Sequence, residues 1–217
     1  MKKGIIFDMD GVIIDNGTAH DEAWKMFCKK YNVNLTDEEL RKNLHGRANK
    51  DILKYLLKKE LQESKIKEYE DEKEMMYRDF YRNEIKEAEG LIDFLKFLKE
   101  KEIKIGIATS SPVENIDFIM DSLNIRDFFD FIVNSAMVKR GKPFPDIYLK
   151  SVEKIGLNRE ECVVFEDSLS GIEAAHMAGI DVIGVTTANK EEEMKNIVFA
   201  VKNFKSEIEK IKNYIIL

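Results

Sequence analysis

The sequence predicts an α/β fold with a Rossmann-like, doubly wound parallel sheet as its core and an inserted all-α domain. From Gly90 onward, short apolar runs alternate with helical patterns, which is typical of parallel strands joined by helices. Residues 18–87, which follow the first apolar run, contain no strand-like segment and have the pattern of several helices. We therefore expect residues 1–15 and 88–217 to form the α/β core and residues 16–87 to form the inserted domain.

The individual elements follow from the apolar periodicity. The first strand is the apolar run that ends before Asp8. Further strands are expected at residues 103–108, 131–134, 162–166, 182–185 and 199–201. Helices are expected at residues 19–31, 63–85, 113–123, 146–155 and 169–178. Thr36 and Glu39 have the spacing of a capping box, which predicts a helix start inside the inserted domain.

Composition limits the class of protein. The chain has 217 residues, 44% of them apolar, and a formal net charge of −6 with both signs mixed, so no basic stripe indicates nucleic acid or an anionic membrane. No apolar run approaches the roughly 18 residues that span a bilayer. The first strand begins almost at once, so we expect no secretory signal. We expect a cytoplasmic protein, monomeric or weakly oligomeric, with Cys28 and Cys162 as reduced core thiols.

Asp8 and Asp10 follow the first apolar run, which begins at Gly4. Side chains alternate along a strand, so both carboxylates would point the same way if the strand continued. Two carboxylates at the carboxyl end of a buried strand are costly unless a cation or protons offset them, and ligands bind at that end of open α/β sheets. The pair by itself is equally compatible with two turn-forming aspartates before Gly11.

Thr109 and Ser110 follow the second strand and precede a helix. We expect Ser111 to be the N-cap of that helix, Pro112 its first residue and Glu114 the partner in a capping box. Thr109 and Ser110 would then lie at a helix N-terminus, where backbone N–H groups favour an anion such as phosphate. A plain helix cap is the alternative for this segment.

Two further segments lie at strand ends. Lys142 and Phe144 each precede a proline, which favours extended backbone and would hold Lys142 at the mouth of the sheet, whereas an ordinary loop lysine is the alternative. Glu166 and Asp167 end an apolar strand and enter a helix. Helix-dipole complementation alone explains them poorly, because a second acidic pair is expected beside them.

Together these segments predict a site for phosphoryl transfer. Like charges so placed would raise one another's pKa or recruit a hard cation, and oxygen ligands favour Mg²⁺. Lys142 and the hydroxyl of Thr109 can hold phosphate oxygens. The acidic residues expected at this sheet edge are Asp8, Asp10, Glu166 and Asp167.

The motifs in this order resemble the haloacid dehalogenase superfamily: Phe-Asp-Met-Asp-Gly, Ala-Thr-Ser, Gly-Lys-Pro and Glu-Asp-Ser. The resemblance covers nearly the whole chain, and the helical insert resembles the small cap of the β-phosphoglucomutase-like branch. It implies that Asp8 is the nucleophile and becomes an aspartyl-phosphate. It also implies that Asp10 is the general acid/base and that its backbone carbonyl binds metal.

The same resemblance assigns the remaining core residues. Thr109 and Lys142 would hold the transferred phosphate. Asp167 would bind Mg²⁺, with Glu166 beside it. A small phosphorylated metabolite, and neither nucleic acid nor a membrane, is the expected partner. Cap side chains would read the rest of the substrate, and the expected substrate-binding residues are His20, His45, Gly46, Arg47, Lys73 and Ser110.

The chain departs from the mutases of this branch in its cap. His45 stands where they carry lysine, and Asn49 stands where an arginine clamps the distal phosphate of the sugar. Pro112 and Val113 replace a lysine-asparagine pair. We therefore favour a Mg²⁺-dependent phosphatase acting on a small metabolite such as a sugar phosphate, with a β-phosphoglucomutase as the alternative. A non-catalytic, phosphate-responsive module like a receiver domain fits less well, because the adjacent early acid pair of receivers is missing.

Overall fold

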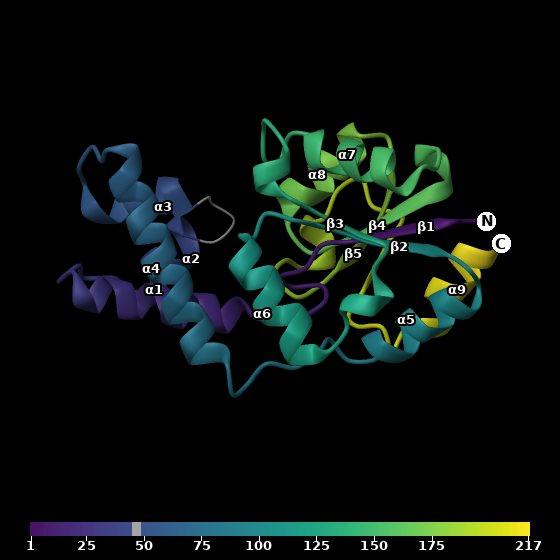
Figure 1. Cartoon of the computed structure of the whole chain (residues 1–217), viewed down its shortest axis with the longest axis horizontal. Helices are drawn as coiled ribbons and strands as arrows, with labels where there is room; N and C mark the ends of the chain where they lie inside the picture. Colours follow the sequence, from purple (N-terminus) through teal and green to yellow (C-terminus); the bar gives the residue numbers. More distant parts are fainter. Residues whose placement is uncertain (45–48) are drawn as a thin grey trace. The chain divides into compact units, whose positions relative to one another are not determined.

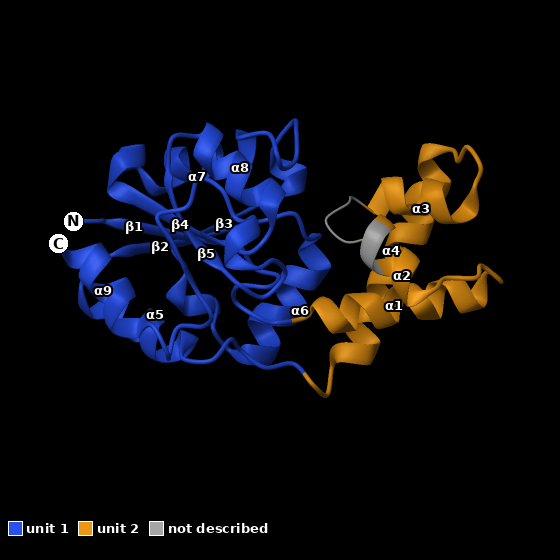
Figure 2. Cartoon of the chain, turned by 180° about the vertical axis from the view of Figure 1, so that it is seen from behind, with its two compact units in different colours: residues 1–15, 85–217 blue, residues 16–84 orange. Residues whose placement is uncertain are grey.

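The computed structural model describes residues 1–44 and 49–217 and divides into two compact units (Figure 2). Unit 1 contains residues 1–15 and 85–217, and unit 2 contains residues 16–84. The chain re-enters unit 1 at Ile85, a little before the boundary at residue 88 that the periodicity suggested.

Unit 1 contains a parallel sheet of six strands with helices between them (Figure 1). The strands are β1 (Gly4–Phe7), β2 (Lys104–Thr109), β3 (Phe131–Asn134), β4 (Cys162–Glu166), β5 (Asp181–Val185) and β6 (Phe199–Val201). The α-helices are α5 (Leu91–Glu100), α6 (Val113–Leu123), α7 (Asp146–Ile155), α8 (Leu169–Met177) and α9 (Ile208–Ile216). Short 3₁₀ turns are η1 (Arg126–Phe128), η2 (Ser135–Met137), η3 (Arg159–Glu161) and η4 (Glu191–Glu193).

The strand order is β3-β2-β1-β4-β5-β6, and every pairing is parallel. This order places β1 between β2 and β4. The carboxyl ends of these three strands therefore meet at the point where the order reverses, which is the ligand-binding position of doubly wound sheets. The predicted fold class is confirmed.

Alternation along the strands separates two buried faces. Ile6 joins a core cluster with Ile147 of α7 and Ile172 of α8. Phe7 points the other way, and its ring centroid lies 6.1 Å from that of Phe94 in α5 and 5.9 Å from that of Phe204. Figure 1 shows α7 and α8 over one face of the sheet and α5 and α9 over the other. Because β1 is covered on both faces, its continuous apolar run needs no polar alternation.

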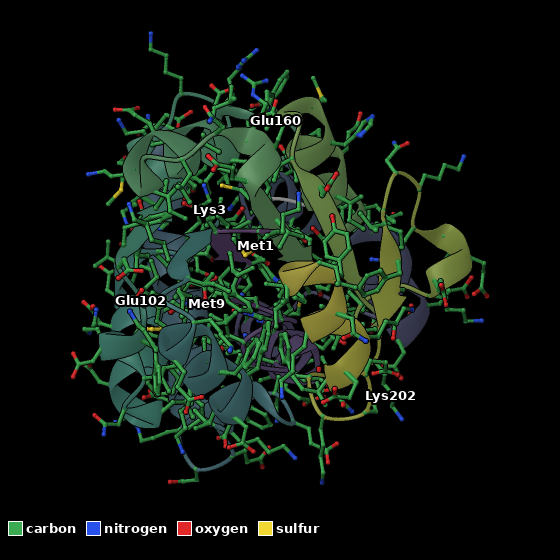
Figure 3. All side chains as sticks on the ribbon, turned by 90° about the vertical axis from the view of Figure 1, so that its right-hand side faces the viewer. Met1, Lys3, Met9, Glu102, Glu160 and Lys202 are labelled. Carbon is green, nitrogen blue, oxygen red and sulfur yellow. The ribbon has the colours of Figure 1, made fainter. Side chains whose placement is uncertain are left out.

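Ion pairs lie at the edge of the sheet where the strands begin. Figure 3 faces this end of unit 1, with Met1 and Lys3 labelled near the start of the chain. Lys3 pairs with Glu161 at 2.6 Å, and Lys2 pairs with Asp181 at 2.7 Å.

Unit 2 consists of α1 (Gly17–Lys30), α2 (Asp37–Asn43), α3 (Asn49–Leu57) and α4 (Glu63–Tyr81), together with the segments that join them. Trp24, Phe27 and Cys28 of α1 form its buried core with residues of the other three helices. The predicted capping box is confirmed, since Thr36 Oγ1 accepts from the N–H of Glu39 at 3.2 Å. The prediction of a helix to residue 85 was wrong, because Glu84 donates to the carbonyl of Tyr81 in a tight turn.

In the described ranges, no helix is long and apolar enough to cross a bilayer. Cys28 and Cys162 are buried free thiols, one in each unit. This agrees with the expectation of core cysteines.

Candidate active site

The parallel register places Asp8 beside Glu166. Phe7 pairs with Phe165 across β1 and β4, and the N–H of Asp8 donates to the carbonyl of Phe165 at 2.9 Å. The ladder thus runs one residue past the end of β1. Both acidic residues are buried, Asp8 at 7% exposed and Glu166 at 0%.

Lys142 lies between these two carboxylates. Its Nζ is 2.8 Å from Asp8 Oδ1 and also contacts Glu166 Oε1, and its side chain is only 6% exposed. The N–H of Phe144 donates to the carbonyl of Gly141 at 3.0 Å, so Lys142 lies in a turn formed by residues 141–144. The placement of Lys142 at the sheet edge agrees with the prediction, and the alternative of an exposed loop lysine was wrong.

Glu166 holds Lys142 in place. Its Oε1 accepts from Lys142 and from the hydroxyl of Tyr148 at 3.0 Å, and its Oε2 accepts from the N–H and the hydroxyl of Ser168. A Cβ on Gly171 would lie 1.7 Å from Glu166 Oε1, so α8 approaches this carboxylate too closely for any larger residue. With four donors around it, Glu166 has the surroundings of a positioning residue.

Asp167 completes a group that can hold a metal ion. One carboxylate oxygen from each of Asp8, Glu166 and Asp167 lies within 4.8 Å of the others. Thr187 Oγ1 lies 3.3 Å from Asp167 Oδ2 and donates to the carbonyl of Gly11 at 2.6 Å. Three buried carboxylates around one ammonium leave an excess of negative charge, and oxygen donors of this kind suit a hard divalent cation.

The electrostatics of the site reflect this excess. Burial raises the pKa of Asp8 to about 7; Lys142 opposes this rise, and Glu166 and Asp10 add to it. Burial and the neighbouring Glu166 likewise hold the pKa of Asp167 well above its usual value. Burial alone would lower the pKa of Lys142, but the two carboxylates outweigh it and raise that pKa well above its usual value. The lysine therefore stays a cation, and the acids favour an additional cation or protons.

Asp10 lies outside the three-carboxylate group and has a different contact. Ser111 Oγ donates to Asp10 Oδ2 at 2.5 Å, and the N–H of Ser111 donates to Thr109 Oγ1 at 3.0 Å. Thr109 is fully buried. The expectation that Ser111 caps the next helix was wrong, because Pro112 is the N-cap of α6 and no side chain caps it. Ser110 is exposed, and its carbonyl accepts from the hydroxyl of Ser135 at 3.0 Å.

Two of the candidate substrate-binding residues, His20 and Lys73, lie together in unit 2. Lys73 Nζ lies 2.8 Å from His20 Nδ1 and 2.9 Å from Glu74 Oε1, although Lys73 is only 2% exposed. Asn49 Nδ2 donates to the same Glu74 oxygen at 2.8 Å. The His20 ring stacks on Tyr77, with centroids 4.0 Å apart. The fold therefore brings together His20 and Lys73. His45, Gly46 and Arg47 lie outside the described residues.

Four residues of the site escaped the sequence reasoning, or were given another role by it. Ser111 was interpreted as a helix cap, and Tyr148 was given no role within the helix expected at residues 146–155. Thr187 and Asn189 follow β5, and the amide of Asn189 donates to the carbonyl of Asp167 at 2.9 Å. Their position after a parallel strand was the available signal, since all such ends share one edge of the sheet.

The chain is similar to known proteins in sequence and in fold. Residues 5–185 match the family described as haloacid dehalogenase-like hydrolase. A phosphorylated carbohydrates phosphatase from Thermotoga maritima is 35% identical over 185 residues, which cover 83% of each chain. A β-phosphoglucomutase from Bacillus subtilis is 32% identical over 196 residues, which cover 84% of this chain and 83% of that protein. The crystal structure of a HAD hydrolase of family IA, variant 3, from Entamoeba histolytica has a TM-score of 0.90 and 33% identity and covers 99% of both chains.

The chain therefore belongs to the haloacid dehalogenase-like hydrolase family, in its β-phosphoglucomutase-like branch. The family predicted from the four motifs is confirmed. So is the prediction that the protein is an enzyme of the phosphohydrolase class. Enzymes of this family generally use Mg²⁺, and the carboxylates of the described site are of the type that binds it.

Proposed function

We propose that the protein is a Mg²⁺-dependent phosphatase that hydrolyses a small phosphorylated metabolite, a sugar phosphate or a related polyol phosphate, through an aspartyl-phosphate. The observation that carries the proposal is the ammonium of Lys142 between Asp8 and Glu166, at the edge where β1, β2 and β4 end. A carboxylate nucleophile beside a fixed cation and a group of hard oxygen donors is the arrangement that phosphoryl transfer requires.

In the proposed first step, a carboxylate oxygen of Asp8 attacks phosphorus. The new Asp8 oxygen–phosphorus bond forms while the bond from phosphorus to the leaving oxygen breaks, and Asp10 gives that oxygen a proton. In the second step Asp10 takes a proton from water, the water oxygen bonds to phosphorus, and Asp8 is released as carboxylate. Lys142 and Thr109 hold the phosphate oxygens throughout.

The acidic residues would have different roles toward the metal ion. Asp8 and Asp167 would provide side-chain oxygens for Mg²⁺, and the carbonyl of Asp10 is assigned as a further ligand by the family resemblance. The four donors around Glu166 support a role in fixing Lys142. When bound, Mg²⁺ neutralises the charge that would otherwise repel a phosphate dianion.

The cluster in unit 2 that contains Lys73, Glu74 and Asn49 favours hydrolysis over mutase chemistry. A mutase must hold the second phosphate of a bisphosphate intermediate, which calls for cationic groups away from the reacting phosphate. Here Lys73 is paired with Glu74, and the amide of Asn49 donates to the same carboxylate. A buried carboxylate among these groups opposes a second phosphate but can accept hydrogen bonds from hydroxyl groups.

A phosphate-release screen tests this proposal. Purified protein with Mg²⁺ is given a panel of sugar and polyol monophosphates, including β-glucose 1-phosphate with a coupled readout of glucose 6-phosphate. We expect phosphate release from several monophosphates and little glucose 6-phosphate. Efficient isomerisation that depends on a bisphosphate primer, with negligible phosphate release, would establish the β-phosphoglucomutase alternative.

The nucleophile variant provides the matched control for this screen. Asp8→Asn should abolish both phosphate release and the acid-stable labelling of the protein by substrate phosphate, because an amide is a poor nucleophile. Asp127→Asn, at an exposed position on η1, should behave like the wild type. Undiminished turnover by Asp8→Asn would contradict the covalent mechanism.

A further inference from the structure

The hydroxyl of Ser111 contacts Asp10, the residue proposed as the general acid/base. Its Oγ donates to Asp10 Oδ2 at 2.5 Å, between residues that are 101 positions apart in the sequence. Both residues belong to unit 1. Ser111 is only 9% exposed, so water competes weakly for this hydrogen bond.

The local backbone holds the hydroxyl in this position. The N–H of Ser111 donates to Thr109 Oγ1 at 3.0 Å, and Thr109 is fixed in the sheet by its pairing with Asn134. Pro112 has φ −68° and ψ 161°, so α6 begins one residue too late for Ser111 to cap it. Ser111 therefore does not cap α6, although it directly precedes the N-cap residue.

We propose that Ser111 is a positioning residue for Asp10: its hydroxyl holds Oδ2 and thereby directs the other carboxyl oxygen toward the leaving group and, later, toward water. This inference rests on the proposed function, in which Asp10 is the acid/base. Proton transfer requires the donor oxygen within hydrogen-bond reach of the acceptor, so a carboxyl group that loses this hydrogen bond spends less time in the productive orientation.

The role has a signature that a purely structural role lacks, because it depends on the leaving group. An alkoxide leaves only if it is protonated, whereas nitrophenolate is a stable anion and leaves without a proton. Loss of the Ser111 hydroxyl should therefore slow phosphoenzyme formation from an alkyl phosphate and spare its formation from p-nitrophenyl phosphate. Hydrolysis of the phosphoenzyme, which needs Asp10 as a base, should slow after either substrate.

The experiment measures single-turnover and steady-state kinetics of Ser111→Ala with p-nitrophenyl phosphate and with the best alkyl phosphate of the screen. For the alkyl phosphate we expect kcat to fall by roughly 10- to 100-fold, less than the 10²–10⁴-fold typical of removing the acid itself, with KM nearly unchanged. The nitrophenolate burst should keep its wild-type rate. Ser111→Thr, which keeps the hydroxyl, should recover most of the activity.

Two further variants make the result specific. Ser151→Ala removes a buried hydroxyl that donates only within α7, to the carbonyl of Ile147 at 2.9 Å, and should match the wild type. In an Asp10→Asn background, Ser111→Ala should add no further loss, because the two residues act as one unit.

Several outcomes would overturn the inference. A burst that slows as much as alkyl turnover, or a KM that rises while kcat stays constant, would mean that Ser111 contacts the substrate itself. Wild-type kinetics of Ser111→Ala would remove any role. A wild-type protein that releases neither nitrophenolate from p-nitrophenyl phosphate nor phosphate from the alkyl phosphate would instead contradict the proposed function, and with it this role for Ser111.

Discussion

At the scale of single residues, the candidate site is a chain of buried charges in which each group constrains the next. Tyr148 and Ser168 hold Glu166, Glu166 holds Lys142, and Lys142 reaches Asp8. Buried ion pairs add little net stability, because desolvation offsets much of their attraction. The arrangement is therefore better explained by chemistry at Asp8 than by stability of the fold.

The metal assignment makes a prediction at this scale. Asp167→Ala removes a carboxylate from the three-residue group and should weaken Mg²⁺ binding, which isothermal titration calorimetry measures directly. Turnover at limiting Mg²⁺ should fall in parallel and recover partly at high Mg²⁺. Asp121→Ala, which removes an exposed carboxylate of α6 that pairs with Arg126, is the control. An unchanged Mg²⁺ affinity in Asp167→Ala would remove this residue from the metal site.

At the scale of secondary-structure elements, the site depends on how closely the elements approach one another at the strand ends. Gly11 has φ +77°, and a Cβ there would lie 1.9 Å from Asp167 Oδ2. Gly171 in α8 has the equivalent contact with Glu166. Glycine at both positions lets backbone and carboxylate share a space that a side chain would fill.

The α8 contact predicts a clear loss on substitution. Gly171→Ala should lower the free energy of unfolding by roughly 1–3 kcal/mol, as expected for overpacking, and should lower turnover because Glu166 and then Lys142 must shift. Gly17→Ala is the matched control: Gly17 is also helical, but nothing lies within 4 Å of an added Cβ. Denaturant titration and phosphate release check both variants. Equal free energies of unfolding for the two variants would show that the close contact between Gly171 and Glu166 does not exclude a Cβ at this position.

At the scale of the whole molecule, the buried acids couple stability to pH and to metal. The pKa of Asp8 is raised to about 7 from an ordinary value of 3.8, so the folded protein binds a proton more tightly than the unfolded chain. The contribution of this group to stability is therefore present below about pH 4 and is lost as pH rises toward about 7. Asp167 is shifted in the same direction.

Mg²⁺ should reverse this dependence, because it binds the ionised carboxylates and competes with their protons. We expect the increase in Tm caused by Mg²⁺ to be small at pH 5 and to grow up to pH 8, where a concentration of about 100 Kd stabilises by about 2.7 kcal/mol. Thermal melting with and without Mg²⁺ across this range measures the increment. In Asp8→Asn, the increase in Tm caused by Mg²⁺ should depend less on pH. An increase in Tm that is independent of pH in the wild type would contradict the assignment of the raised pKa to the metal site.

The sequence by itself determined the sheet, most of its helices and the family to which the chain belongs. The strands expected at residues 131–134, 162–166 and 199–201 have those bounds in the structure. Local information sufficed there, because an apolar run between turn residues defines a buried strand wherever the chain places it. The motifs around Asp8 and Lys142 were likewise contiguous, and their order was enough to recognise the family.

Only the tertiary structure decided which side chains meet. Lys142 and Asp8 are 134 positions apart, and nothing local states that Glu166 holds the lysine from its other side. Ser111 illustrates the limit well: its neighbours in sequence predict a helix cap, yet its hydroxyl contacts Asp10. A short polar side chain satisfies whichever partner the fold brings within about 3 Å, and that partner is set by strand order and register, which periodicity along the chain does not encode.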